Sequence, residues 1–162
     1  MNIFLKLLVI ILIIFLNSCS KKEEKISVIQ EKELRLQMID AYKEGVKALE
    51  KGDVLFAAKK FNEAEILFPQ SKWASKSILM AAYSYYTQNY YYDAISELER
   101  FIKKYPKDEK LNYAHFLLAM CYYEQIIDEK KDLGPLLNAQ KEFKFIVKNY
   151  PKNKRLTTRI FF

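Results

Sequence analysis

An internal repeat constrains the fold of this 162-residue chain more than any other feature of its sequence. In each copy, small and bulky apolar residues recur at fixed offsets, and a proline follows them. In the first copy these residues are Gly45, Ala57, Phe61, Ala64 and Pro69. In the second copy, 37 residues further along, they are Ala82, Ala94, Leu98, Phe101 and Pro106. The third copy has Ala119, Ala139, Phe143, Ile146 and Pro151, with its first two positions 20 residues apart instead of 12. A repeat of this length indicates stacked structural units.

The offsets are typical of tetratricopeptide (TPR) repeats, in which each unit is a pair of antiparallel helices, A and B. The small residues allow the two helices to cross closely, and the proline ends helix B. The sequence therefore predicts an all-α, TPR-like solenoid of about three repeats and six helices. The expected repeats are residues 31–69, 71–106 and 108–151, with a loop insertion at 128–137. The expected helices run from near 32 to 52, then over 54–67, 71–87, 91–104, 109–127 and 136–149.

The N-terminal segment has the organisation of a secretory signal. Lys6 precedes an unbroken apolar run from Leu7 to Leu16. This run is too short to span a bilayer but has the length of the apolar region of a signal peptide. It ends in Leu-Asn-Ser-Cys at residues 16–19, which resembles the lipobox of bacterial lipoproteins.

The lipobox resemblance implies a signal peptide at residues 1–18, a covalent lipid on Cys19, and a lipidated tether at residues 19–30. Several acyl chains on one residue hold a protein firmly at a membrane. Ser20, where an aspartate would imply inner-membrane retention, implies sorting to the outer membrane. The alternatives are an uncleaved anchor, or a plain secretory signal followed by an incidental cysteine.

Composition and charge limit the functions that this chain can have. The formal charge is +7, but the lysines alternate with glutamates along the expected helices, as on an ordinary solvated face. We therefore expect no nucleic-acid binding. Cys121 lies among apolar residues at helical spacing, and we expect it to be a buried small hydrophobic residue.

The sequence offers no candidate for catalysis or for metal binding. His115 is the only histidine, and we expect it to be a surface residue or a satisfied helix residue. With only three glycines there is no glycine-rich phosphate loop, and no nucleophile–histidine pair is evident. We therefore expect no enzymatic activity, no metal site and no cofactor other than the covalent lipid on Cys19.

The A helices of TPR stacks line a concave face, and counting within each repeat predicts which residues point into it. Eleven of the twelve positions carry apolar or aromatic side chains, so we expect a groove that is poor in charge and suited to an extended peptide. The alternative is that part of this set packs against the B helices or the N-terminal segment. The candidate peptide-binding residues are Tyr42, Val46, Leu79, Tyr83, Tyr86, Phe116, Met120 and Tyr123.

Residues 152–162 form an atypical tail that is basic and then apolar, without the pattern of a further helix A. A solenoid needs a polar cap at each end. We therefore expect a C-terminal end that is frayed, sticky or completed by another chain, with Phe145 and Val147 facing water.

Lipobox, tether and repeats together resemble the BamD family of outer-membrane β-barrel assembly lipoproteins. The resemblance covers about residues 31–153. The insertion in the third repeat adds to its specificity. The matching stretches are Tyr42–Gly45, Phe68–Ala74, Met80–Tyr83, Arg100–Ile102, Tyr105–Pro106 and Cys121–Ile126.

This resemblance implies a non-enzymatic scaffold of the β-barrel assembly machine, lipid-anchored at the periplasmic face of the outer membrane. The implied partners are a BamA-type barrel subunit, the other lipoproteins of the machine, and the C-terminal segments of unfolded outer-membrane proteins, which end in an aromatic residue. Members of the family carry about five repeats, whereas this sequence shows three. The alternative function is a TPR lipoprotein scaffold for cell-envelope organisation or pilus assembly.

Overall fold

The computed structural model describes residues 28–126 and 132–151, and within these ranges it contains six α-helices and no strand. From Lys32 onward the helices belong to one compact unit. Of the preceding unit, Met1–Glu31, the structure describes only the first turn of the first helix. The predicted signal peptide, Cys19 and the tail at 152–162 lie outside the described residues. No helix in the described part is both long and apolar enough to cross a membrane.

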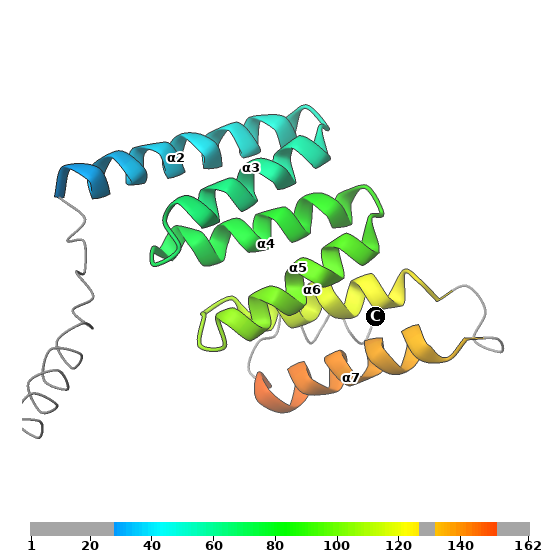
Figure 1. The fold of residues 1–162 in the computed structure, drawn as a ribbon. Coiled ribbons are helices and arrows are strands. Elements are labelled where there is room, and N and C mark those ends of the chain that lie inside the picture. The colour runs from blue at the N-terminus through cyan, green and yellow to red at the C-terminus, as the bar shows by residue number, and fades with distance from the viewer. Residues whose placement is uncertain (1–27, 127–131, 152–162) are drawn as a thin grey trace, which may run out of the picture. The chain divides into compact units, whose positions relative to one another are not determined.

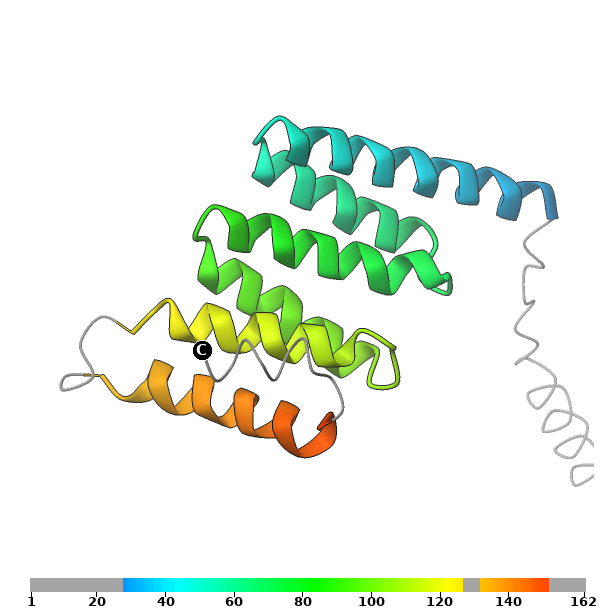
Figure 2. The same cartoon turned by 180° about the vertical axis from the view of Figure 1, so that it is seen from behind.

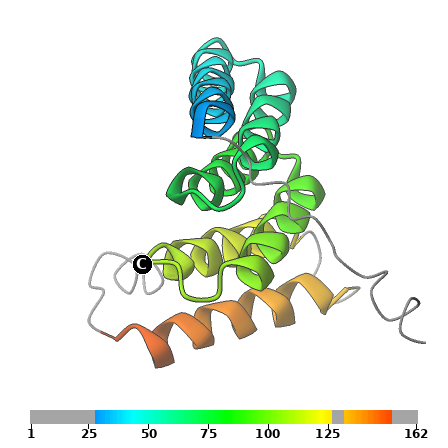
Figure 3. The same cartoon turned by 60° about the vertical axis from the view of Figure 1, so that its left-hand side comes forward.

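The described helices follow the predicted order of three A–B pairs (Figure 1). Consecutive helices run antiparallel and side by side, as the view from behind also shows (Figure 2). In Figure 3 the A helices α2 and α4 lie on one side of the B helices α3 and α5. The helices are α2 (Val28–Glu50), α3 (Val54–Leu67), α4 (Lys72–Thr87), α5 (Tyr91–Lys104), α6 (Leu111–Tyr123) and α7 (Gly134–Asn149).

The bounds of α3 and α5 are those predicted, but other helix ends differ. The first helix begins at Val28 rather than near residue 32, so residues 28–30 of the predicted tether are helical. The helix α6 ends at Tyr123 rather than at 127. There the side-chain amide of Gln125 donates to the Cys121 carbonyl at 2.8 Å and satisfies an acceptor at the helix end.

The loop predicted at 128–137 is too long, because α7 already begins at Gly134. The Gly134 amide donates to Asp132 Oδ1 at 2.8 Å, and Pro135 occupies the start of the helix, where its missing N–H leaves no unpaired donor. Leu136 and Leu137 are therefore helical, and both are exposed.

Close A–B contact in the first pair depends on a small residue, as the repeat pattern predicted. A Cβ atom added at Gly45 would lie 2.9 Å from ring carbons of Phe61, which is itself fully buried.

The turns after α2 and α4 have similar backbone conformations. Gly52 has φ +80° and Asn89, 37 residues later, has φ 63°, and glycine and asparagine are the residues that adopt this left-handed conformation most easily.

Two hydrophobic cores lie along the stack. The first contains buried side chains of α2, α3 and α4, and Phe61 and Met38 are its largest fully buried side chains. The second contains buried side chains of α4, α5 and α6, including Leu98 and Phe101. Ala81 of α4 belongs to the first core and Ala82 to the second, so this helix is a wall of both.

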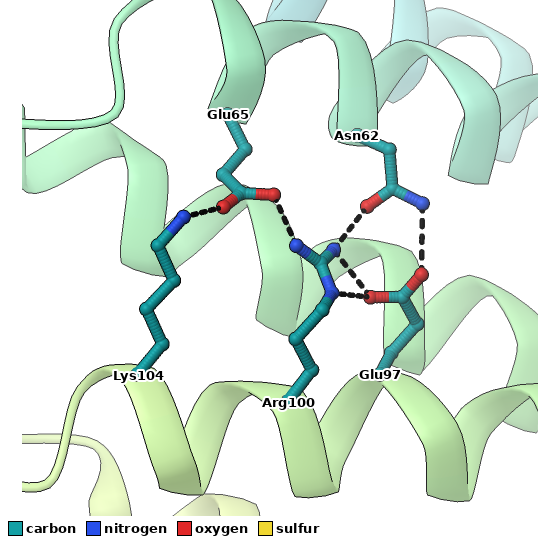
Figure 4. A network of polar contacts seen from close by, with 5 residues as sticks. All are labelled: Asn62, Glu65, Glu97, Arg100 and Lys104. Carbon is teal, nitrogen blue, oxygen red and sulfur yellow. Dashed lines mark hydrogen bonds and ion pairs between the residues drawn. The ribbon is translucent and has the colours of Figure 1, made fainter.

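A polar network joins the B helices of the first two repeats (Figure 4). Glu65 of α3 is buried and forms ion pairs with both Arg100 and Lys104 of α5. The same arginine donates to Asn62 Oδ1 at 2.9 Å and to Glu97 Oε2. We call Asn62, Glu65, Glu97, Arg100 and Lys104 the B-helix network. It bonds each of the two carboxylates to at least one cation, and the ion pairs of Glu65 cross the junction between repeats.

Candidate functional site

The A-helix face, formed by the predicted groove positions on α2, α4 and α6, is divided into separate pockets. We name each pocket after a residue type or residue that distinguishes it. No single pocket contains all eight candidate residues, and four of the eight belong to the hydrophobic cores or pack against them, namely Tyr42, Val46, Leu79 and Tyr86. The predicted groove is therefore a series of separate pockets.

The first of these, the Trp73 pocket, has a volume of about 410 Å³ and lies between α2 and the start of α4. Tyr42 is buried there, with its ring edge-on to Phe61 and Trp73 at centroid distances of 5.2 and 5.0 Å. Lys76 Nζ lies 4.8 Å from the Trp73 ring and 5.2 Å from the Tyr42 ring, so a cation covers two aromatic faces. The residues that line it are Ile39, Tyr42, Lys43, Val46, Lys47, Glu50 and Trp73.

The tyrosine pocket lies between α4 and α6 and has a volume of about 390 Å³. Leu79 forms a buried part of its wall, whereas Tyr83 is 38% exposed. The structure thus brings two predicted residues together with Tyr113 of α6. The pocket is lined by Lys76, Leu79, Met80, Tyr83, Lys110 and Tyr113.

The lysine pocket adjoins the tyrosine pocket at the N-terminal ends of α4 and α6 and has a volume of about 530 Å³. Lys76 and Lys110 line both pockets. Asp108 accepts from the Lys110 amide at 2.8 Å, so one of the two acids of the pocket is bonded to the backbone of the turn before α6. Its lining residues are Lys72, Ser75, Lys76, Lys107, Asp108, Glu109 and Lys110.

The expectation of a charge-poor groove is wrong for the pocket rims, because lysines line every one of these pockets. Counting only positions on the concave stripe of each A helix missed Lys72, Lys107 and Trp73. The signal for the two lysines is a pair of lysines at the start of α4, Lys72 with Lys76, and a second pair just before α6, Lys107 with Lys110. Lysines at a helix start are unfavourable for the helix dipole, which favours acids there.

The remaining candidate residues lie elsewhere. Phe116 is buried against Phe143 of α7, with ring centroids 6.4 Å apart, and Met120 is half-buried. Tyr86 packs on the second core, and burial, together with the nearby Glu124, raises the pKa of its hydroxyl. These placements favour the alternative that part of the set packs within the helical stack.

Tyr123 is 56% exposed and lines a Tyr123 pocket of about 550 Å³ between α6 and α7. The predicted exposure of Phe145 and Val147 is confirmed, since each is 36% exposed. Val147 lines this pocket, so apolar surface lies open beside the last described helix pair.

Two residues without a predicted functional role are as expected. Cys121 is fully buried, and burial raises the pKa of its thiol to about 12, so the thiol is protonated and unreactive at neutral pH. His115 is a satisfied helix residue: its Nδ1 lies 2.6 Å from Glu142 Oε2. Within the described residues no group of three or more histidine, cysteine or acidic side chains is placed to hold a metal ion.

Comparison with known proteins identifies the family of this chain. A family model described as YfiO, outer membrane lipoprotein, matches residues 35–157. The chain belongs to this family. The matched region includes all three A-helix pockets and the B-helix network.

Three relatives of this YfiO-family chain are each named outer membrane protein assembly factor BamD. The protein of Caulobacter vibrioides is 34% identical over 139 residues, which cover 86% of this chain and 45% of the relative. That of Rickettsia prowazekii is 26% identical over 151 residues, covering 92% and 58%. That of Xylella fastidiosa is 24% identical over 119 residues, covering 67% and 41%. The chain therefore spans about half the length of these relatives.

Proposed function

We propose that this chain is a non-enzymatic subunit of the machinery that assembles β-barrel proteins in the outer membrane. It is held at the periplasmic face by a lipid on Cys19, and its A-helix face receives extended segments of unfolded barrel proteins. Family membership and the names of the three relatives support this role. They do not favour the alternative of an envelope-organising or pilus-assembly scaffold.

The observation that carries the peptide-binding part is the shared wall of the tyrosine and lysine pockets. Lys76 and Lys110 stand between an apolar, aromatic hollow and a basic one. A peptide that ends in an aromatic residue presents a ring and a carboxylate on adjacent atoms. The ring packs against Leu79 and Tyr83, and the carboxylate lies near the lysines.

The test is a binding measurement with the full chain in detergent. A fluorescent peptide with a terminal phenylalanine and a free carboxylate is compared with the same peptide as an amide and with one ending in alanine. Both changes should weaken binding about tenfold, since each removes one of the two contacts.

Two variants complete this measurement. Tyr83→Ala should weaken binding of the free-acid peptide, whereas Tyr92→Ala, which truncates an 82% exposed tyrosine on a B helix, should not. Equal affinity for all three peptides, or equal effects of the two variants, would remove the peptide-binding proposal.

Separate experiments address the anchor and the partners. Mass spectrometry of the mature protein should find a lipid-modified Cys19 at the N-terminus, and an unmodified cysteine or an intact Met1 would refute the anchor.

Purification from detergent-solubilised membranes should recover the barrel-forming BamA-type subunit with this chain. Its absence, with lipidation intact, would refute membership of the machinery while leaving the anchor standing.

A further inference from the structure

The B helices face each other at two junctions, and the repeat allows the two to be compared position by position. The first junction, between α3 and α5, is closed by the B-helix network (Figure 4). The second lies between α5 and α7. Equivalent B-helix positions differ by 37 residues between repeats 1 and 2, and by 45 between repeats 2 and 3, as Ala57, Ala94 and Ala139 show.

At the second junction four of the five network positions carry a different residue, and the glutamate at the Glu97 position is kept as Glu142. The position of the buried acid Glu65 is occupied by the apolar Ile102 at the second junction. A cation at the facing position of the second junction would therefore have no carboxylate to pair with. The arginine that Glu65 binds becomes Phe145. The complete set of equivalents is Glu99 for Asn62, Ile102 for Glu65, Glu142 for Glu97, Phe145 for Arg100 and Asn149 for Lys104.

All five equivalent residues line one cleft of about 750 Å³, which we call the α5–α7 cleft. The cleft occupies the place in the second junction that is equivalent to the place of the ion pairs in the first junction. Ile102, Leu118 and Phe145 give it apolar surface. Phe145 stays 36% exposed even though its ring centroid lies 4.0 Å from that of the buried His115.

The cleft has an excess of positive charge, because four lysines and two acids line it. Its two acids are already engaged, since Glu142 is bound by His115 and Glu99 accepts from the Tyr122 hydroxyl at 3.2 Å. Across the described part of the chain, none of the four lysines of the cleft forms an ion pair. These lysines are Lys103, Lys141, Lys144 and Lys148.

We propose that the α5–α7 cleft is a docking site for a partner protein segment that presents one aromatic side chain between acidic residues. The aromatic ring packs on Phe145 and Ile102, and the flanking carboxylates pair with the surrounding lysines. The cleft shares no residue with the tyrosine or lysine pockets, so the proposal is independent of peptide reception on the A-helix face.

Charge decides against two other occupants. A second copy of this chain carries a net charge of +7, and the segment 152–162 contains four basic residues and no acid. Either would bring further positive charge against the four lysines. An acidic segment of a different protein meets them with complementary charge.

The test uses the full chain in detergent and fluorescence anisotropy with a labelled, end-capped peptide in which one phenylalanine stands between two pairs of aspartate and glutamate. Three comparison peptides replace the phenylalanine with alanine, replace the acids with lysine, or copy residues 152–162. The acidic aromatic peptide should bind at least about tenfold more tightly than each of them. Raising the salt concentration should weaken its binding, because the lysine contacts are exposed.

Two sets of variants locate the binding. Lys141→Glu with Lys148→Glu should weaken the acidic aromatic peptide at least about tenfold, whereas the matched pair Lys51→Glu with Lys59→Glu, on other exposed lysines, should not. The triple variant Ile102→Glu, Phe145→Arg and Asn149→Lys rebuilds the first-junction network in the cleft. It should abolish binding while circular dichroism shows unchanged helix content.

If the triple variant does not fold, the charge-reversal pairs alone decide. The proposal is overturned if the basic or 152–162 peptide binds as well as the acidic one, or if the two charge-reversal pairs have the same effect. Sedimentation provides a further check: a dimer that Lys141→Glu with Lys148→Glu dissociates would identify a second copy as the occupant and refute the acidic partner.

Discussion

Removing the charge of Glu65 should destabilise the fold, because this carboxylate is the acceptor for two cations across the first B-helix junction. Its side chain is 3% exposed, whereas those of Arg100 and Lys104 are 39% and 45% exposed. Glu65→Gln keeps the shape of the side chain but removes its charge, and it leaves one amide oxygen to accept from one of the two cations, while the amide nitrogen cannot accept from the other.

The expected loss of stability follows from these exposures. Hydrogen bonds to charged groups contribute about 1.5–3 kcal/mol each, and breaking a fully buried ion pair costs about 3–5 kcal/mol. Because both cations are partly solvated, they regain water when the acid is neutralised, and the loss is much smaller than that sum. We expect about 2 kcal/mol, measured as a lower urea midpoint in circular dichroism at 222 nm with an unchanged slope.

Acid provides an independent check of the same carboxylate. Burial alone would raise the pKa of Glu65, but the hydrogen bonds from Lys104 and Arg100 outweigh it and lower the pKa below the ordinary value of 4.5. The unfolded chain therefore protonates first as pH falls. The stabilisation from Glu65 is complete above the unfolded pKa and is lost as pH falls from about 4.5 through the folded pKa.

The stability difference between the native chain and Glu65→Gln should accordingly shrink on acidification. The matched control is Glu63→Gln on the same helix, whose acid is 43% exposed and pairs with Lys60, and it should change stability by less than about 0.5 kcal/mol. Equal effects of the two variants, or a difference that does not depend on pH below 5, would refute the reasoning.

Three further predictions concern packing, capping and reactivity. Gly45→Ala should lower the free energy of unfolding by about 1–3 kcal/mol, because its methyl group would overlap the Phe61 ring; an unchanged urea midpoint would contradict this. Asp53→Ala should cost about 1 kcal/mol, because Asp53 Oδ1 accepts from the Phe56 amide at 3.2 Å at the start of α3, and Asp53→Asn should restore most of it. Cys121 should resist iodoacetamide at pH 8 in the folded chain and react in urea, as followed by mass spectrometry; rapid reaction of the native protein would contradict its burial.

The fold could be predicted because its determinants are periodic. Small residues at Gly45 and Ala57, bulky ones at Phe61 and prolines beyond the B helices recur along the chain, and they place two helices per repeat. Helix ends were less predictable because they depend on single side-chain contacts. The amide of Gln125 ends α6, and the carboxylate of Asp132 starts α7, and neither contact belongs to the repeat.

The candidate site was predictable only in part. Position counting found Leu79 and Tyr83, which share a pocket, but it could not show that Trp73 and Lys76 separate them from Tyr42. Position counting considered only the residues along one face of each A helix, whereas the pockets also include residues from the starts of these helices.

The B-helix network was not found from the sequence, although a signal was present. Glu65 and Arg100 are 35 residues apart and form no local motif. Aligning the repeats shows the replacement of Arg100 by Phe145, which distinguishes the two junctions. Pairwise contacts between repeats therefore require the repeats to be aligned with one another as well as read along the chain.

The place of α4 as a wall of both hydrophobic cores has a consequence for the dynamics of the stack. In a repeat array each unit is stabilised chiefly by its neighbours, so a segment with partners on both sides opens only when both interfaces separate. Amide protons of α4, around Ala81 and Ala82, should consequently exchange with deuterium more slowly than those of α2 or α7. A molecule bound to the exposed side of this helix would then slow the opening of both neighbouring helix pairs at once, with no change in their structure.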